Sequence, residues 1–197
     1  MALSKIDVAN MLTGATPVAN GGTALTSGTS GQFLKFTGST TLASTALSAG
    51  KILQVVQATH GTETNTNSST YQQSGLTANI TPSATSSKIL IQYVLPMYQD
   101  ANGSAICSAL NAIFKGGSNL HEFGAVWGMT SRTINYAYQG TGFYRDAPNT
   151  TSQVTYDIRY RPYDTGEGQL IYSCPDSNYG GLGADSQATL ILMEIGA

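Results

Sequence analysis

Apolar residues in this sequence fall into short runs. The three longest runs are residues 51–58, 88–97 and 188–195, in which β-branched, aliphatic and aromatic side chains predominate. Runs of this length and composition are typical of buried strands, because helices usually need ten or more residues. We expect residues 88–97 to form the central strand. Its paired part should end at Pro96, which has no N–H to donate to a ladder.

A second kind of pattern alternates with period two. Its clearest instance is residues 154–161, where Val, Tyr, Ile and Tyr alternate with Thr, Asp, Arg and Arg. This pattern predicts a strand with one apolar face and one charged face, the charged one being wet or at a subunit contact. Residues 106–114 and 120–127 are expected to pair as a hairpin across residues 115–118, and residues 59–70 are too polar to be buried and should form a loop.

These segments together predict an all-β protein. About eight or nine short antiparallel strands, separated by turn signals, are the pattern of an antiparallel β-sandwich or jelly roll, which we assign to residues 51–197. Helix should be nearly absent. Residues 1–50 differ in composition and are predicted to be an extended, Gly/Ser/Thr-rich arm.

The arm cannot bury a core of its own. Residues 32–36 form a short apolar run between glycines, but so few apolar groups cannot offset the entropy of ordering the chain. We therefore expect the arm to order only on neighbouring copies and to attach the chain to another protein. The candidate attachment residues are its first apolar side chains: Leu3, Ile6, Val8, Met11 and Leu12.

Charged residues make up 10% of the 197 residues, against roughly 25% in an average soluble protein. A surface of Ser, Thr, Asn, Gln and Gly suits a protein that is held in an assembly. The net charge of -2 and the absence of a Lys/Arg cluster argue against a nucleic-acid partner. No signal-peptide pattern and no 18-residue apolar stretch is present, so we expect synthesis in a cytoplasm and no membrane insertion.

Residues 17–34 read PVANGGTALTSGTSGQFL. This segment resembles the glycine-rich segment common in bacteriophage tail-fibre and related virion fibre proteins. The opening residues 1–6, the run 50–58 and the closing residues 190–195 are also similar to proteins of that kind. The resemblance implies a homotrimer with an N-terminal attachment and a C-terminal β knob, whereas composition alone implies only an assembled, β-rich chain.

The sequence offers little for catalysis or for metal binding. His60 and His121 lie in different segments, no serine has a G-x-S-x-G context, and no Cys or His pair has metal-ligand spacing. We expect no enzyme activity, no cofactor and no metal. A glycan-cleaving site would need paired carboxylates, for which Asp157, Asp164 and Glu167 are the nearest candidates. We interpret them instead as a strand-face charge that pairs with a neighbouring arginine and as loop residues.

Two cysteines and eleven tyrosines remain. We interpret Cys107 and Cys174 as buried thiols, although the sequence leaves open whether they pair. Half of the tyrosines in the last third of the chain fall at alternating strand positions that suit a core or a subunit contact. Tyr163 and Tyr179, in expected loops, are the candidates for an exposed ligand surface that binds a host glycan.

The hypothesis from sequence is a bacteriophage virion structural protein, made in the host cytoplasm. It would be a homotrimeric tail-fibre-type surface protein, anchored to other virion proteins by its N-terminal arm, with a β knob for host attachment. The alternative is a capsid decoration protein or head fibre that stabilises the capsid. A third hypothesis is a polysaccharide-cleaving tailspike domain.

Overall fold

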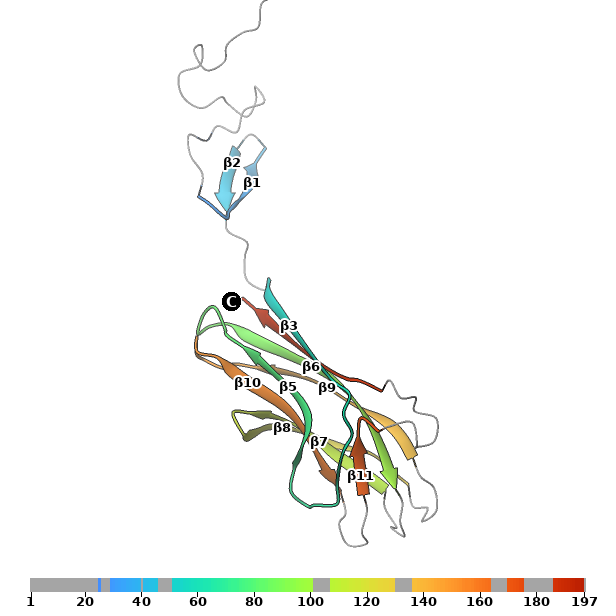
Figure 1. Cartoon of the computed structure of the whole chain (residues 1–197). Coiled ribbons are helices and arrows are strands. Elements are labelled where there is room, and N and C mark those ends of the chain that lie inside the picture. Colours follow the sequence, from blue (N-terminus) through green and yellow to red (C-terminus); the bar gives the residue numbers. More distant parts are fainter. Residues whose placement is uncertain are drawn as a thin grey trace, which may run out of the picture. The chain divides into compact units, whose positions relative to one another are not determined.

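The structure of the chain is a computed structural model (Figure 1), and it describes residues 25, 29–39, 41–45, 51–100, 107–129, 136–163, 170–175 and 186–196. These residues form twelve β-strands and no helix, which confirms the prediction of an all-β protein. Within the described ranges, therefore, no helix is long and apolar enough to cross a membrane.

The chain divides into two units, Met1–Ala49 and Gly50–Ala197. The described part of the first unit is an antiparallel hairpin of β1 (Phe33–Gly38) and β2 (Thr41–Thr45). The second unit holds the other strands: β3 (Ile52–His60), β4 (Thr64–Thr66), β5 (Gln72–Ile80), β6 (Lys88–Asp100), β7 (Cys107–Lys115), β8 (Ser118–Met129), β9 (Tyr136–Asp146), β10 (Val154–Pro162), β11 (Leu170–Ser173) and β12 (Ala188–Ile195).

The second unit is a sandwich of two antiparallel sheets (Figure 1), as the sequence predicts. One sheet has four strands in the order β5-β10-β7-β8. The other has six, in the order β3-β12-β6-β11-β4 with β9 paired to β6. The hairpin predicted across residues 115–118 is confirmed as β7 and β8, and positive φ angles of 55° and 85° at Gly116 and Gly117 make its tight turn.

Strand β6 is central, as predicted, but its pairing does not end at Pro96. On one side β9 pairs with it from Ile89 to Gln99, and Pro96 lies opposite Gln139 within that ladder. On the other side β12 pairs only as far as Val94, and β11 begins at Met97. The carbonyl of Pro96 accepts a hydrogen bond from the N–H of Cys174 on this second side, at 2.9 Å. The missing N–H therefore faces the gap between β12 and β11, where no ladder bond is needed.

The segment 59–70 was expected to be a loop, and that expectation is partly wrong. Strand β3 continues to His60, and the three residues of β4 pair with β11. The hydroxyl of Thr64 bonds those of Tyr160 and Ser173, at 3.0 and 2.7 Å. Thr64 can therefore lie in a strand at the sheet edge because its hydroxyl finds partners there.

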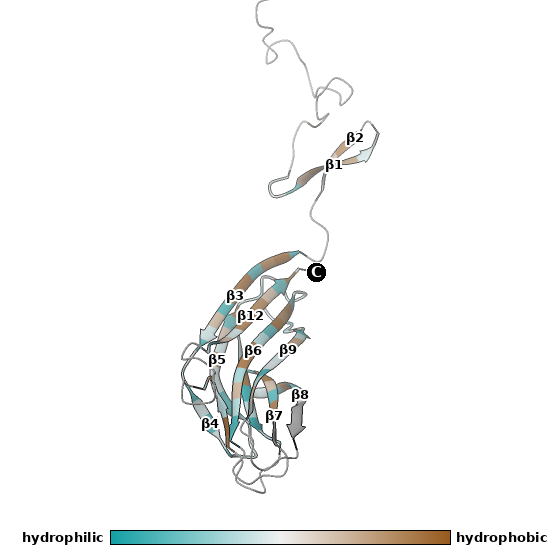
Figure 2. Cartoon of the chain, turned by 90° about the vertical axis from the view of Figure 1, so that its right-hand side faces the viewer, coloured by the Kyte–Doolittle hydropathy of each residue, from teal (hydrophilic) through white to brown (hydrophobic). Residues whose placement is uncertain are grey.

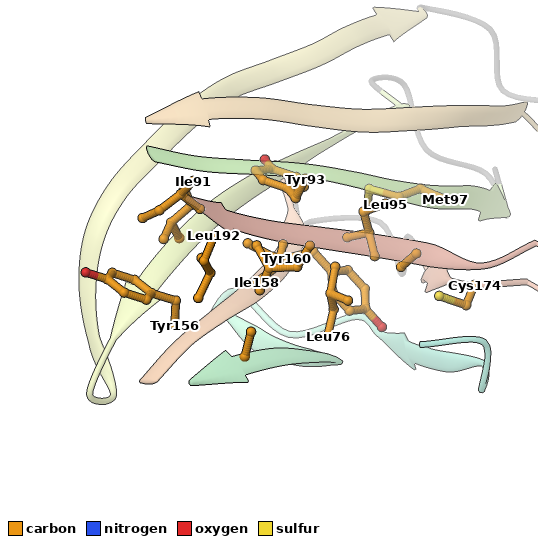
Figure 3. Close-up of a cluster of buried hydrophobic side chains, with 14 of the residues drawn as sticks. Leu76, Ile91, Tyr93, Leu95, Met97, Tyr156, Ile158, Tyr160, Cys174 and Leu192 are labelled. Atoms are coloured by element: carbon orange, nitrogen blue, oxygen red, sulfur yellow. The ribbon is translucent and has the colours of Figure 1, made fainter. Parts of the chain in front are cut away.

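The core lies between the two sheets (Figure 3). Tyr156, Ile158 and Tyr160 of β10 are fully buried and meet Ile91, Leu95 and Leu192 of the six-stranded sheet, which confirms the apolar face predicted for residues 154–161. Cys174, labelled at one end of this cluster, is a free, buried thiol whose Sγ donates to the carbonyl of His60 at 3.3 Å. Burial raises the pKa of this thiol.

Two glycines let β9 lie close to the opposite sheet. A Cβ on Gly142 would overlap the rings of Tyr93 and Phe123, and a Cβ on Gly140 would overlap the Asn111 side chain. Tyr93 and Phe123 meet edge to face at 5.6 Å between ring centroids. The absent side chains of β9 thus make room for aromatic rings from β6 and β8.

Among the described residues three carboxylates are buried, and each has partners. Asp146 accepts hydrogen bonds from Lys115 Nζ at 2.9 Å and from the Tyr156 hydroxyl at 2.7 Å. Glu194 lies on the core side of β12 and accepts from the Ser83 N–H at 2.7 Å, the Ser83 hydroxyl at 2.6 Å and Gln54 Nε2 at 2.6 Å. The third carboxylate, Asp157, belongs to the outer face of the four-stranded sheet.

Candidate functional site

Strand β10 carries three charged residues of the four-stranded sheet. Its outer residues are Thr155, Asp157, Arg159 and Arg161, because their neighbours Tyr156, Ile158 and Tyr160 all point into the core. Strand β10 lies between β5 and β7, so these side chains run along the middle of the sheet. We call this outer surface of β5, β10, β7 and β8 the polar face.

An ion pair fixes the centre of the polar face. Arg159 Nε donates to Asp157 Oδ2 at 2.5 Å, and the two side chains are only 18% and 9% exposed. The guanidinium also lies 4.1 Å from the centroid of the Phe114 ring, which β7 places directly opposite Asp157. The structure therefore pairs Asp157 with Arg159, as the sequence analysis proposed. A carboxylate on one edge and an aromatic ring on one face hold the guanidinium in a single orientation.

Tyr71 extends this arrangement into a cluster. Its ring meets Phe114 edge to face at 5.5 Å, and the guanidinium of Arg161 lies 5.1 Å from its centroid. Burial raises the pKa of Tyr71 well above its usual range, the carboxylate of Glu122 raises it further, and Arg161 offsets part of that effect. The Tyr71 hydroxyl therefore stays protonated and can donate a hydrogen bond at any physiological pH.

A β-bulge opens a pocket beside this cluster. The register moves from Thr77 opposite Asp157 to Gln73 opposite Arg159, so three residues of β5 face Ile158 alone. Gly75, in the bulge, has a φ of 84°, and its Cα packs so closely against the His60 ring that no Cβ could fit. Ser74 closes the bulge because its hydroxyl donates to the carbonyl of Ile158 at 2.7 Å.

The pocket has a volume of about 120 Å³. It can receive one small group and not a whole drug-sized ligand, because pockets for such ligands have volumes of about 300–1,000 Å³. Backbone and side-chain atoms of six residues line it: Gln73, Gly75, Leu76, Thr77, Thr155 and Asp157.

The lining of the pocket suits hydroxyl groups. Asp157 offers carboxylate oxygens and Gln73 offers an amide. The hydroxyls of Thr77 and Thr155 donate to the Tyr156 carbonyl and to Asn79 Oδ1, so they offer their oxygens as acceptors. A sugar hydroxyl both donates and accepts, so it can use an acceptor and a donor that lie side by side. The carboxylate disfavours an anionic group in the pocket itself.

The residues considered for catalysis and for metal binding do not form one cluster in the described part of the chain. No group of three His, Cys, Asp or Glu side chains there could hold a metal ion. His121 stacks on Tyr144 at 4.5 Å between ring centroids and meets Phe123 edge to face, so its role among the described residues is packing. Asp164 and Glu167, the other carboxylates considered for cleavage, lie outside the described residues.

Of the candidate ligand and attachment residues, only Tyr163 lies within the described residues. Tyr163 directly follows β10, is 55% exposed, and donates its backbone N–H to the carbonyl of Ser108 at 2.9 Å. It thus lies at the end of the strand that carries Arg159 and Arg161. Tyr179 lies outside the described residues, as do all five attachment candidates: Leu3, Ile6, Val8, Met11 and Leu12.

Sequence reasoning missed the pocket and the Tyr71 cluster. A glycine inside a strand pattern is a signal for a bulge, and Gly75 in residues 71–80 gave that signal. No local pattern pointed to Tyr71, because its partners Phe114 and Arg161 come from β7 and β10.

No protein-family model matches the sequence, and a comparison with curated proteins finds no match. Solved structures give weak likenesses. Dimeric latent PorU from Porphyromonas gingivalis has a TM-score of 0.35 at 13% identity over 90% of this chain and 15% of that chain. The VP2 subviral particle of infectious bursal disease virus has a TM-score of 0.29 at 17% identity over 83% of this chain. A T=1 particle derived from the same virus has a TM-score of 0.30 at 15% identity.

The chain spans 42% of the VP2 chain in the first of these viral particles and 40% in the second. At these TM-scores the likeness carries no argument about function. The functional conclusion must therefore come from the chain's own residues.

Proposed function

We propose that this chain is a structural protein of a bacteriophage virion, which joins the particle through its N-terminal unit and presents the β-sandwich at the surface. In its leading form the proposal is a homotrimeric tail-fibre-type protein. The resemblance of residues 17–34 to virion fibre proteins supports the class of particle, and the exposed hairpin of the first unit supports assembly.

The hairpin is the observation that carries the proposal. Phe33, Leu34 and Phe36 of β1 are 59%, 56% and 64% exposed, although they are the largest apolar side chains of the strand. An isolated two-stranded hairpin is marginally stable at best in water. With apolar side chains exposed on both of its faces, this hairpin gains most of its stability only when another surface covers it.

A test follows from residues 1–50. Deleting them from the phage-encoded chain should remove the protein from purified particles while the sandwich remains folded. A finer test is the double substitution Phe33→Ser and Phe36→Ser, with Lys35→Ser as the matched control on the same strand. Quantitative mass spectrometry of particles should show loss for the double variant and full occupancy for the control. Full occupancy of the truncated chain would contradict the proposal.

The same measurement separates the tail-fibre proposal from the capsid alternative. A capsid decoration protein or head fibre is spread over the shell and is present in many copies, whereas a tail fibre occupies a few sites. The ratio of this chain to the major capsid protein therefore decides between them. The tailspike alternative predicts that particles cleave host polysaccharide and lose this activity with Asp164→Asn or Glu167→Gln.

The second part of the proposal is that the polar face binds a neutral sugar of the host surface. The pocket supports this because it combines the Asp157 carboxylate with two threonine hydroxyls beside a fixed guanidinium. Saturation-transfer NMR with the methyl glycosides of glucose, galactose, mannose and N-acetylglucosamine tests it, with methyl glucuronide as the acidic comparison.

At least one neutral glycoside should bind to the pocket. Asp157→Asn should weaken that binding by about tenfold, the equivalent of one charge-assisted hydrogen bond, and Gln73→Ala should weaken it less. Asn119→Ala, two strands away on the same sheet, is the control. Binding that is unchanged by the pocket variants, or binding of the acidic glycoside alone, would refute this part of the proposal.

A further inference from the structure

The outer side of the six-stranded sheet carries apolar side chains in neighbouring cross-strand rows, and Gln57, Gln92 and Arg145 lie in the same rows. In one cross-strand row, Val55 of β3 lies opposite Met193 of β12, which lies opposite Leu90 of β6. In the next row, Ile191 and Phe143 flank Gln92 of β6. Side chains that lie directly opposite in antiparallel strands are about 5 Å apart, so neighbours within each row touch. We call this surface the apolar face and define it by six residues: Val55, Leu90, Val94, Phe143, Ile191 and Met193.

Strand β12 has apolar side chains on both of its faces. Its core-side residues Leu190 and Leu192 are fully buried, while their neighbours Ile191 and Met193 remain partly exposed. A strand that is apolar on both faces is normally packed between two layers. Figure 2 shows apolar colouring on parts of β3, β12 and β6, interrupted by hydrophilic positions. Among the described residues of the second unit, only one of the two layers is present.

The exposed apolar area on this sheet is that of a functional surface patch. Val55 and Phe143 are 58% and 61% exposed, and at the end of β3 Ile52 and Leu53 are 58% and 38% exposed. At roughly 200 Å² for a large apolar side chain, these four alone expose roughly 400 Å². This already matches the largest apolar patch of a typical monomer, about 300–600 Å². Leu90, Val94, Ile191 and Met193 add to it, toward the roughly 800 Å² per partner of a standard interface.

The charge of the chain favours a second copy as the occupant. With a net charge of -2 on 197 residues, two copies repel each other only weakly when they meet. The polar face on the other sheet remains free for solvent, so an interface on the apolar face hides no part of the pocket. A partner with a strongly charged surface would find few charges here to pair with, because Arg145 is the one charged side chain in these two rows.

We propose that the apolar face binds a second copy of this chain. The inference rests on the proposed virion assembly and adds to it the surface on the sandwich through which neighbouring copies meet. Contact there covers the second side of β12 and β6 and removes Val55 and Phe143 from water.

Site-directed photocross-linking of the full chain tests this interface. Phe143 is replaced by p-benzoylphenylalanine, which keeps an aromatic ring at the position, and Asn119 on the polar face is replaced in the same way as the control. Irradiation of the Phe143 form should give a covalent dimer whose cross-linked peptides, identified by mass spectrometry, both come from this chain. The Asn119 form should give none.

A second variant checks that the contact is the apolar one. Val55 lies on the surface, so circular dichroism should show that the Val55→Asp chain keeps its fold. In this chain the yield of the Phe143 cross-link should fall at least about tenfold, as expected for burying one charge in an interface. Absence of the Phe143 cross-link, or equal cross-linking at Asn119, overturns the inference. If the Phe143 cross-link is absent and the chain still enters particles, only the proposed interface is wrong. If the Phe143 cross-link forms and the chain never enters particles, the proposed function is wrong.

Discussion

Glu194 offers the sharpest test of how the sandwich is held together, because it is a fully buried carboxylate surrounded by donors. Burial raises its pKa, but the hydroxyls of Ser83 and Ser87, the amide of Gln54 and the N–H of Ser83 lower the pKa by more, to about 2 from an ordinary 4.5. The carboxylate ties β12 to β3 and to the turn before β6.

The lowered pKa of Glu194 sets the size of its contribution to the stability of the fold and the pH range over which that contribution is lost. A difference of about 2.5 pKa units corresponds to about 3 kcal/mol of stability. Because the pKa is lower in the folded state, this contribution is fully present above pH 4.5 and is lost as the pH falls toward 2. The folded state then has to bind a proton on a group whose partners are all donors.

Glu194→Gln removes the charge at constant shape. Its NH₂ group would face the donors of Ser83 or Gln54, so we expect a loss of about 2–3 kcal/mol at pH 7. Urea unfolding followed by far-UV circular dichroism, at one fixed protein concentration, measures this loss. The difference between wild type and variant should shrink from pH 5 toward pH 2.

Asp100→Asn is the control, since it removes one negative charge from a partly exposed position at the end of β6. It should change stability by under about 0.5 kcal/mol. If Glu194→Gln is as stable as wild type at pH 7, or if its deficit is the same at pH 2 as at pH 7, the carboxylate does not hold these strands as described.

Three further predictions concern the core. Gly142→Ala should cost about 1–3 kcal/mol in urea unfolding because its Cβ would overlap Tyr93 and Phe123, whereas Gly124→Ala, which meets nothing within 4 Å, should be nearly neutral; equal costs would contradict the packing of β9. Tyr156→Phe should cost about 1–2 kcal/mol because it removes the hydroxyl that bonds Asp146, while Tyr163→Phe at the exposed end of β10 should not; no difference between them would argue against that hydrogen bond. Burial raises the pKa values of Tyr93, Tyr156 and Tyr160, so stability should fall as the pH rises above 10 and these tyrosines should ionise, by absorbance titration, only as the fold is lost; early ionisation would contradict their burial.

The sequence predicted what local patterns control. Residues 154–161 alternate with period two, and β10 turns out to bury Tyr156, Ile158 and Tyr160. The adjacent glycines Gly116 and Gly117 predicted the turn between β7 and β8 because positive φ suits glycine there. In both cases the residues that carry the information are neighbours in the chain.

What failed depended on neighbours that are distant in the chain. Pro96 remains inside the β6 ladder because β12 and β11 leave a gap on the side of its missing N–H, and no sequence near residue 96 records that gap. The pocket likewise needs β5 and β10 to slip in register, and the Tyr71 cluster needs three separate segments. Such features depend on topology and could not be read from residue patterns alone.

The two sheets of the sandwich therefore differ in a way that bears on assembly. Strand β10 alternates polar and apolar residues and has an outer face suited to water or to a hydroxyl-rich ligand, whereas β12 is apolar on both faces. A free monomer would gain nothing from apolar side chains on the outside of β12 and would lose solubility because of them. If copies cover the apolar face, the polar face is the sheet left to meet the host, so the pocket beside Asp157 and the contact through Phe143 are compatible on every copy.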